Sequence, residues 1–223
     1  VMPKAETAFS RNNAVYDTTI GWRFVNPKMK AEFGVDSMPE TADNVAADHD
    51  VSREDQDAFA ARSQERYAAA AEKGVFAEEI APVTIPQRKG EDVVIDSDEH
   101  PRPGTTLEKL GKLRGINGAD LTVTAGNASG VNDGAAAMLL ASEAGVKDHG
   151  LAPIARVVAM SAAGVEPRVM GIGPIPAVRK VLDRAGLTIE QMDVIELNEA
   201  FASQGLATLR ALGVPDDAAH VNA

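Results

Sequence analysis

Two adjacent polar residues, Asn198 and Glu199, follow a short apolar segment that the residue pattern predicts to be a β-strand. In α/β sheets, ligands bind at the carboxyl ends of strands. An asparagine there can hold a water molecule or donate a hydrogen bond to an oxygen on which negative charge develops. The ordinary alternative is that Asn198 caps the helix that follows, which is the more frequent role of an asparagine in such a position. The sequence leaves both roles open.

A glycine-rich turn from Gly126 to Gly134 also follows a predicted strand. Its spacing matches neither the dinucleotide fingerprint G-x-G-x-x-G nor the phosphate-binding loop G-x-x-x-x-G-K-[ST]. Spacing alone favours a structural role, in which the glycines let the chain approach a neighbouring element closely. In the functional alternative, Ser129 and nearby backbone N–H groups face a ligand. The turn from Met170 to Pro176 contains G-x-G but is stiffened by its prolines, and spacing favours a structural role there too.

One arginine between two prolines and the absence of cysteine also bear on the chemistry. Arg102 lies between Pro101 and Pro103, so it is a rigid cation that could meet a phosphate group. A solvated surface charge is at least as frequent. The 223 residues include no cysteine and four scattered histidines. The sequence therefore excludes thiolate chemistry within this chain and predicts no metal site.

The charge balance limits the partners that the protein can have. There are 22 Lys and Arg against 33 Asp and Glu, which gives a formal net charge of −11. Nucleic acids and anionic membranes would repel such a surface, so we expect neither as a partner. No apolar run approaches the roughly 20 residues of a spanning helix, and the first residues do not resemble a signal peptide. We therefore expect a cytoplasmic protein.

The elements that must position these residues alternate between strands and helices. Ser52 is a good N-cap for a helix that Gly74 would end. A nearly all-apolar helix at 135–144 would be buried on all sides. The remaining expectations are an irregular packed loop or short helices within 1–40, a short helix capped by Thr41, a hairpin of 83–85 with 93–95, and strands at 121–124, 151–160 and 192–197. Helices are expected at 106–110 and 177–185, and the segment 198–202 should lead into a helix that runs to Leu212. This alternation is typical of an α/β layered fold.

Three ordered motifs resemble the thiolase family, the acyl-CoA acyltransferases that make or cleave 3-oxoacyl-CoA. They are TAGNASGVNDGAAA at 124–137, MGIGPIPA at 170–177 and ELNEAFA at 196–202. The segment SMPETADNVA at 37–46 is similar to the region before the family's loop helix, and GWRFVNP at 21–27 is similar to the 3-oxoadipyl-CoA branch. The resemblance implies a partial thiolase-like α/β layered fold with an α+β loop domain.

The resemblance also implies roles for individual residues. Asn198 corresponds to the asparagine that holds a catalytic water in an oxyanion hole. Arg102 corresponds to a residue near the nucleotide end of coenzyme A. The residues that correspond to pantetheine contacts are Met38, Ser129, Gly130, Met170, Ala200 and Phe201. Coenzyme A or acyl-CoA would be a substrate rather than a permanently bound cofactor, and the intact protein would be a homotetramer or homodimer with residues 1–40 near a subunit contact.

The chain departs from the family pattern in its reactive residues. Thiolases use a nucleophilic cysteine, a histidine in a Gly-His-Pro motif and a second cysteine, and none of these is present. We therefore expect an internal piece of a thiolase: the loop domain at 1–130, the last helix of the N-terminal half at 131–150 and the first part of the C-terminal half at 151–223. Because the acyl-enzyme route needs a thiolate, this chain alone is expected to be inactive.

Two other functions compete with a thiolase piece. A non-catalytic protein on the same scaffold could bind coenzyme A or act in protein interactions. A Rossmann-type nucleotide-binding enzyme is disfavoured because the glycine fingerprint is missing. Binding of coenzyme A against NAD would separate the Rossmann alternative from the other two.

Overall fold

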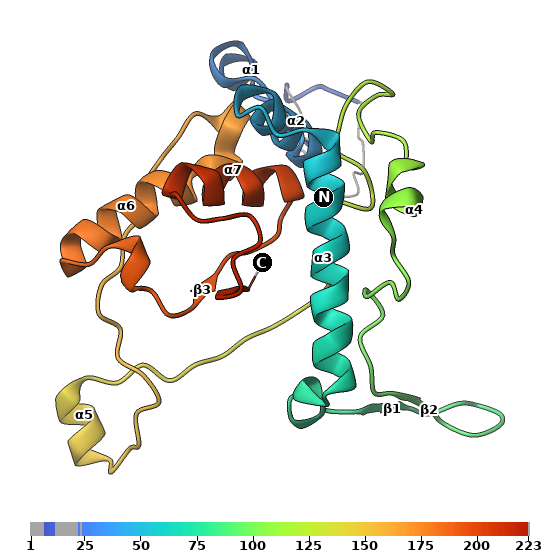
Figure 1. Ribbon diagram of the computed structural model, residues 1–223. Coiled ribbons are helices and arrows are strands. Elements are labelled where there is room, and N and C mark those ends of the chain that lie inside the picture. Colours follow the sequence, from blue (N-terminus) through green and yellow to red (C-terminus); the bar gives the residue numbers. More distant parts are fainter. Residues whose placement is uncertain (1–6, 12–21, 23, 223) are drawn as a thin grey trace.

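The computed structural model describes residues 7–11, 22 and 24–222, and helices dominate these ranges (Figure 1). The α-helices are α1 (Pro27–Phe33), α2 (Met38–Asp48), α3 (Arg53–Glu72), α4 (Leu107–Gly111), α5 (Glu143–Asp148), α6 (Pro174–Ala185) and α7 (Ala202–Leu212). The 3-10 helices are η1 (Val75–Glu78), η2 (Pro167–Ile172) and η3 (Ile189–Gln191), and the strands are β1 (Val83–Ile85), β2 (Val93–Ile95), β3 (Ile195–Glu196) and β4 (Val221–Asn222). Of the loop or short helices expected within 1–40, α1 is present, while 1–6, 12–21 and 23 lie outside the described residues.

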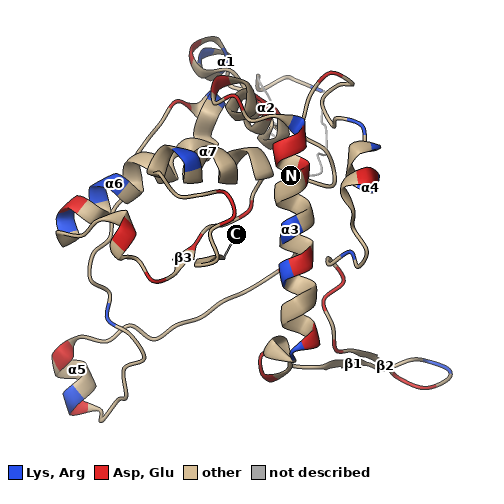
Figure 2. Cartoon of the chain, viewed as in Figure 1, with Lys and Arg blue, Asp and Glu red and all other residues tan. Residues whose placement is uncertain are grey.

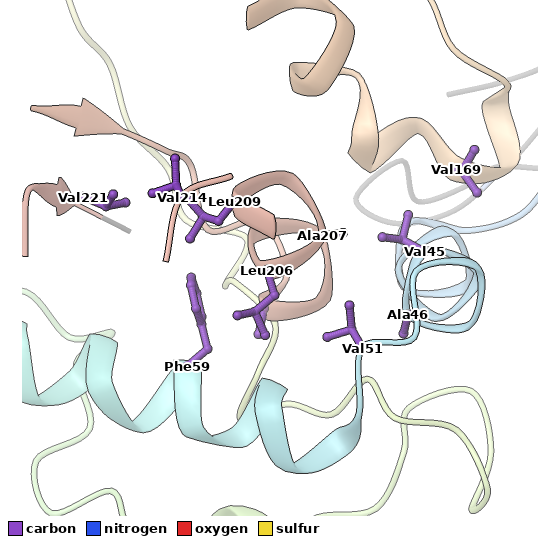
Figure 3. Close-up of a cluster of buried hydrophobic side chains, with 11 residues drawn as sticks. Val45, Ala46, Val51, Phe59, Val169, Leu206, Ala207, Leu209, Val214 and Val221 are labelled. Atoms are coloured by element: carbon purple, nitrogen blue, oxygen red, sulfur yellow. The ribbon is translucent and has the colours of Figure 1, made fainter. Parts of the chain in front are cut away.

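The hydrophobic core forms where α7 packs against α2, α3 and η2. Leu206 and Leu209 of α7 are each 1 % exposed, and Figure 3 shows them beside Phe59 of α3. Gly205 lets α3 and α7 approach closely, because a Cβ built there would lie 3.0 Å from Phe59 Cζ. The core therefore holds α7 firmly, and with it the segment that carries Asn198.

The expected helix after Ser52 is confirmed. The Ser52 side chain accepts a hydrogen bond of 3.0 Å from the Asp55 N–H, and Gly74 adopts a left-handed φ of 74° just beyond α3. The expectation that Thr41 caps a short helix is wrong, because α2 begins three residues earlier, at Met38. Its N-cap is Ser37, whose backbone N–H donates to the Glu40 carboxylate over 2.6 Å.

Two small sheets are present in the described residues. The expected hairpin is confirmed: β1 and β2 are antiparallel, with Thr84 opposite Val94, and they project away from the helices (Figure 1). In the second sheet β3 pairs in parallel with β4, with Ile195 opposite Val221. The strand expected at 192–197 is thus confirmed only as the short β3.

The strand expected at 121–124 is wrong, because a carboxylate replaces the neighbouring strand that it would need. Oδ1 of Asp43 accepts the backbone N–H groups of Thr122 and Val123, each over 3.0 Å. Val123 and Thr124 are fully buried all the same. Side-chain hydrogen bonding therefore holds this segment against α2 without a β-ladder.

The expected buried helix at 135–144 and strand at 151–160 are also wrong. Residues 131–142 form neither helix nor strand, and the helix in this region is the short α5. Met138 is 81 % exposed, Leu139 is 79 % exposed and Val158 is 70 % exposed. An apolar helix gains most of its stability from packing, and no element in the described part of the chain covers residues 135–144. Figure 2 shows the segment before α5 as nearly free of charged residues.

The other expected helices are present: α4 at 107–111, α6 ending before Gly186 at φ 67°, and α7 from Ala202 to Leu212. The result is a mixed helix and sheet architecture, as expected. None of the helices in the described ranges combines the length and the apolar character needed to cross a membrane. The domain boundaries at residues 130 and 150 stay predictions.

Candidate functional site

Asn198 lies between β3 and α7 and lines two cavities. The larger has a volume of about 410 Å³ and is lined by Met38, Met170, Asn198, Ala200 and Phe201, together with apolar residues of α6 and α7; we call it the methionine cavity. The smaller has a volume of about 270 Å³ and is lined by Ser63, His100, Ser129, Asn198 and Glu199, among others; we call it the polar pocket. Asn198 is the residue that the two linings share.

Of the two roles left open for Asn198, the one as cap of the following helix is wrong. The N-cap of α7 is Phe201, three residues later, and its backbone is extended. Asn198 is exposed, and its side chain makes no hydrogen bond within the described part of the chain. Its amide is therefore available to a ligand in either cavity.

A short antiparallel contact joins the turn after Asn198 to the glycine-rich turn. Ala128 forms an isolated bridge with Phe201. The Ser129 N–H donates to the Ala200 carbonyl over 3.0 Å, and the Ala202 N–H donates to the Asn127 carbonyl over 2.9 Å. Two motifs that are far apart in the sequence are thereby fixed beside each other.

Buried polar side chains also hold the glycine-rich turn in place. Oδ1 of Asn127 accepts the Thr124 N–H over 2.8 Å, and its amide donates to the Thr122 carbonyl over 3.0 Å and to Asp57 over 3.2 Å. Gln56, which is fully buried, donates to the Thr122 hydroxyl over 3.0 Å. These contacts attach the turn to α3 and so determine where Ser129 lies.

Glu199 is the acidic group of the polar pocket. Ser63 on α3 donates to its Oε2 over 2.7 Å, while its Oε1 is buried without a partner in the described residues. Burial raises the pKa of Glu199 above its ordinary value, and the opposing influences are the Ser63 hydroxyl and the charges of Arg66 and Arg62. A carboxyl can accept hydrogen bonds in the pocket, and in its protonated form it can also donate one.

The structure brings most of the expected site residues together around Asn198. Met38, Met170, Ala200 and Phe201 line the methionine cavity and Ser129 lines the polar pocket. The remaining two, Gly130 and Arg102, line neither cavity.

Gly130 and Arg102 lie next to residues of the polar pocket instead. A Cβ at Gly130 would lie 2.5 Å from Oδ1 of Asn132 and 2.8 Å from Nδ1 of His100, so these side chains would have to shift to admit a larger residue. The Arg102 guanidinium donates to the carbonyls of Glu99 and Pro101. In this structure it is an exposed charge that turns back on its own loop.

Ser63 and His100 were not predicted from the sequence, and Glu199 was assigned no role. Glu199 lies beside Asn198 in the motif, so proximity was a usable signal. Ser63 comes from the middle of a helix with no motif, and only the folded chain brings it to Glu199. Among the described residues, no group of three or more His, Asp or Glu could hold a metal ion.

Models of known families match both parts of the chain. The model described as "Thiolase, N-terminal domain" matches residues 3–144, and the model described as "Thiolase, C-terminal domain" matches residues 151–223. The chain therefore belongs to the thiolase family, which confirms the resemblance found in the motifs.

Individual relatives agree with this assignment. The chain is 67 % identical over 222 residues to the beta-ketoadipyl-CoA thiolase of Pseudomonas putida, and the match covers all of this chain and 55 % of the relative. It is 62 % identical to the 3-oxoadipyl-CoA/3-oxo-5,6-dehydrosuberyl-CoA thiolase of Escherichia coli K12, with the same coverage. The chain thus spans about half the length of the curated relatives it matches.

Solved structures confirm the partial thiolase fold. The acetyl-CoA acetyltransferase of Bacillus anthracis superposes with a TM-score of 0.77 at 45 % identity, covering 84 % of this chain and 47 % of that one. Human mitochondrial 3-ketoacyl-CoA thiolase superposes with a TM-score of 0.72 at 41 % identity, covering 83 % and 46 %.

Proposed function

We propose that this chain is the substrate-binding part of a thiolase that transfers an acyl group between a cysteine thioester and coenzyme A. The reaction would be thiolytic cleavage or Claisen condensation of a 3-oxoacyl-CoA, and the names of the similar proteins favour 3-oxoadipyl-CoA as the substrate. The observation that carries the proposal is the place of Asn198, whose side chain is unpaired in the described residues and lines both cavities.

Asn198 would stabilise the negative charge that develops on the thioester oxygen. Its amide can donate a hydrogen bond to that oxygen directly or through a water molecule. It is presented on a turn fixed by the backbone contact between Ser129 and Ala200. A donor held in place before the reaction costs no reorganisation during it, which is the physical basis of this kind of catalysis.

The two cavities would divide the substrate between them. The methionine cavity has apolar walls that suit the carrier arm of coenzyme A, with Met38, Met170, Ala200 and Phe201 as contacts. Ser129 would contact the substrate from the polar pocket, with Gly130 behind it. Arg102 would reach a coenzyme A phosphate by releasing the carbonyls that it now binds. Coenzyme A is a substrate in this proposal, and no permanently bound cofactor is required.

Substrate binding and catalytic turnover depend on different residues of a thiolase. A covalent acyl-enzyme needs a thiolate, and the sequence contains no cysteine. We therefore expect the 223-residue chain to bind acyl-CoA without cleaving it. We also expect a homo-oligomer, a tetramer or a dimer, as the assembled form.

Calorimetric titration with coenzyme A and with NAD tests the proposal. Coenzyme A should bind and NAD should not, and Asn198→Ala should leave coenzyme A binding within about twofold because the amide acts on the thioester oxygen. Binding of NAD alone, or of neither compound, would contradict the proposal. A thiolysis assay on the same sample should show no turnover.

A further inference from the structure

One loop carries the only asparagine of the sequence that a glycine follows. Asn117 precedes Gly118, and every other asparagine precedes a different residue. A backbone nitrogen can attack the side-chain carbonyl carbon of the asparagine before it, which converts that asparagine into an acid. Glycine favours this attack because it has no Cβ to hinder the approach and leaves the backbone free to turn. Asn117 is therefore the asparagine of this chain that is most prone to deamidation.

The structure leaves the attacking nitrogen free. Asn117 and Gly118 lie in no helix or strand, and both are partly exposed. The Ile116 N–H donates to the Val123 carbonyl over 2.8 Å, which closes the loop around them. The Gly118 carbonyl accepts the Leu121 N–H over 3.2 Å, whereas the Gly118 N–H makes no hydrogen bond within the described part of the chain. That nitrogen can therefore lose its proton without breaking a contact of the described residues.

Asn117 also belongs to the hydrogen-bond network around Asp43. Its amide donates to Oδ2 of Asp43 over 2.7 Å. Asp43 is buried, and its other carboxyl oxygen accepts the backbone N–H groups of Thr122 and Val123. An acid at position 117 would lack the donor and would place a second negative charge beside the first. Both changes oppose the network that holds this segment against α2.

We propose that Asn117 is a site of spontaneous deamidation and that the carboxylate so formed loosens the segment that Asp43 holds. The Gly118 nitrogen gives its proton to a base and forms a bond to Cγ of Asn117. The bond from Cγ to Nδ2 breaks, and Nδ2 takes up a proton and leaves as ammonia. Water then opens the resulting five-membered imide at either carbonyl, which gives aspartate or isoaspartate. Water is the co-reactant, and nothing is oxidised or reduced.

Incubation of the chain at pH 7 and at pH 9, followed by tryptic digestion and mass spectrometry, tests the modification. Asn117 and Asn127 fall in one tryptic peptide, 115–147, and fragmentation of that peptide separates the two positions. Asn117 should be converted, and faster at pH 9, because the attacking nitrogen must lose its proton. Asn127 is buried and precedes alanine, so it should stay intact. Equal conversion of the two asparagines, or no conversion of either, would overturn the proposal.

Gly118→Ala provides the matched variant. A Cβ at this position would have the Cδ1 atom of Leu121 as its nearest neighbour, at the ordinary contact distance of 3.8 Å, so the loop should keep its structure. The methyl group hinders the attack, and conversion of Asn117 should slow by about tenfold or more. An unchanged rate would show that the Gly118 nitrogen is not the attacking group, which contradicts the proposed step.

Urea unfolding of Asn117→Asp, which has the same chemistry as the aspartate product, tests the effect on Asp43. Its unfolding midpoint should fall by about 0.5–1 M. Asn117→Ala removes the donor without adding a charge, and its midpoint should fall by less. The control is Asn132→Asp at an exposed position, which should stay within about 0.2 M of the unsubstituted chain. A midpoint for Asn117→Asp that is no lower than that of Asn117→Ala would mean that the new charge does not act on Asp43.

Discussion

The hydroxyl of Ser63 donates a hydrogen bond of 2.7 Å to Oε2 of Glu199, joining the middle of α3 to the turn that carries Asn198 across 136 positions of sequence. Glu199 is the residue next to Asn198, so this contact also fixes the backbone of the proposed oxyanion site. Because the other carboxyl oxygen is buried without a partner in the described residues, Ser63 is the main local support for the carboxylate.

Ser63→Ala should therefore destabilise the chain. Removing the donor leaves a half-buried carboxylate without its hydrogen bond, and we expect a loss of about 1–2 kcal/mol in the free energy of unfolding. Urea unfolding followed by circular dichroism measures it. Ser97→Ala, at an exposed loop position, is the matched control and should change stability by less than about 0.5 kcal/mol. Equal effects of the two substitutions would show that the Ser63 contact contributes nothing.

Glu199→Gln should change how stability depends on pH. Burial raises the pKa of Glu199 in the folded chain above the ordinary value of 4.5. Between those two values the folded state binds more protons than the unfolded state, so this group contributes a stability that is lost as pH rises. Glutamine does not titrate, and the variant should therefore gain stability relative to the unsubstituted chain as pH rises from 4.

Urea unfolding of both proteins at several pH values between 4 and 7 measures this difference, in which all other titrating groups cancel. The difference should grow above pH 4.5 and level off above the raised pKa of Glu199. A difference that stays constant over the whole range would mean that Glu199 titrates normally in the folded chain.

Local signals predicted the elements that depend on their own residues. The N-cap at Ser52 and the left-handed Gly74 defined α3, and β-branched runs around a polar turn defined the hairpin. These features need no distant partner. Asn198 was found in the same way, from its place after an apolar segment.

Elements that depend on distant partners were not predictable in the same way. The segment at 121–124 has the alternation of a strand, yet its N–H groups bind Asp43, about 80 positions earlier. The apolar run at 135–144 has the composition of a buried helix, and whether it forms a helix depends on the elements that pack against it. The contact of Ser63 with Glu199 joins two residues that carry no shared pattern. Sequence therefore located the motifs, while tertiary contacts determined which side chains complete the polar pocket.

Asp43→Ala should be more damaging than Ser63→Ala. The Asp43 carboxylate is 8 % exposed and accepts from the N–H groups of Thr122 and Val123 and from the amide of Asn117 over 2.7 Å. Its loss leaves several buried donors unpaired, and we expect about 2–4 kcal/mol lower stability in urea unfolding. Asp193→Ala, at an exposed loop position, is the control and should be nearly neutral.

The same Asp43 variant should weaken coenzyme A binding, because the segment it holds leads directly to Asn127 and Ser129. A variant that loses stability yet binds coenzyme A with unchanged affinity would show that the glycine-rich turn is positioned without Asp43.

The apolar segment around α5 should cause the isolated chain to associate. Met138, Leu139 and Leu140 are each more than 70 % exposed, and apolar surface of this kind normally finds a partner or aggregates. Light scattering coupled to size-exclusion chromatography should give a mass above the 23.4 kDa of one chain. The double substitution Leu139→Asp with Leu140→Asp should lower that mass, because burying two carboxylates in a contact is costly. Leu107→Asp, at an exposed leucine of α4, is the matched control, and a monomer in all three samples would show that this segment makes no contact between copies.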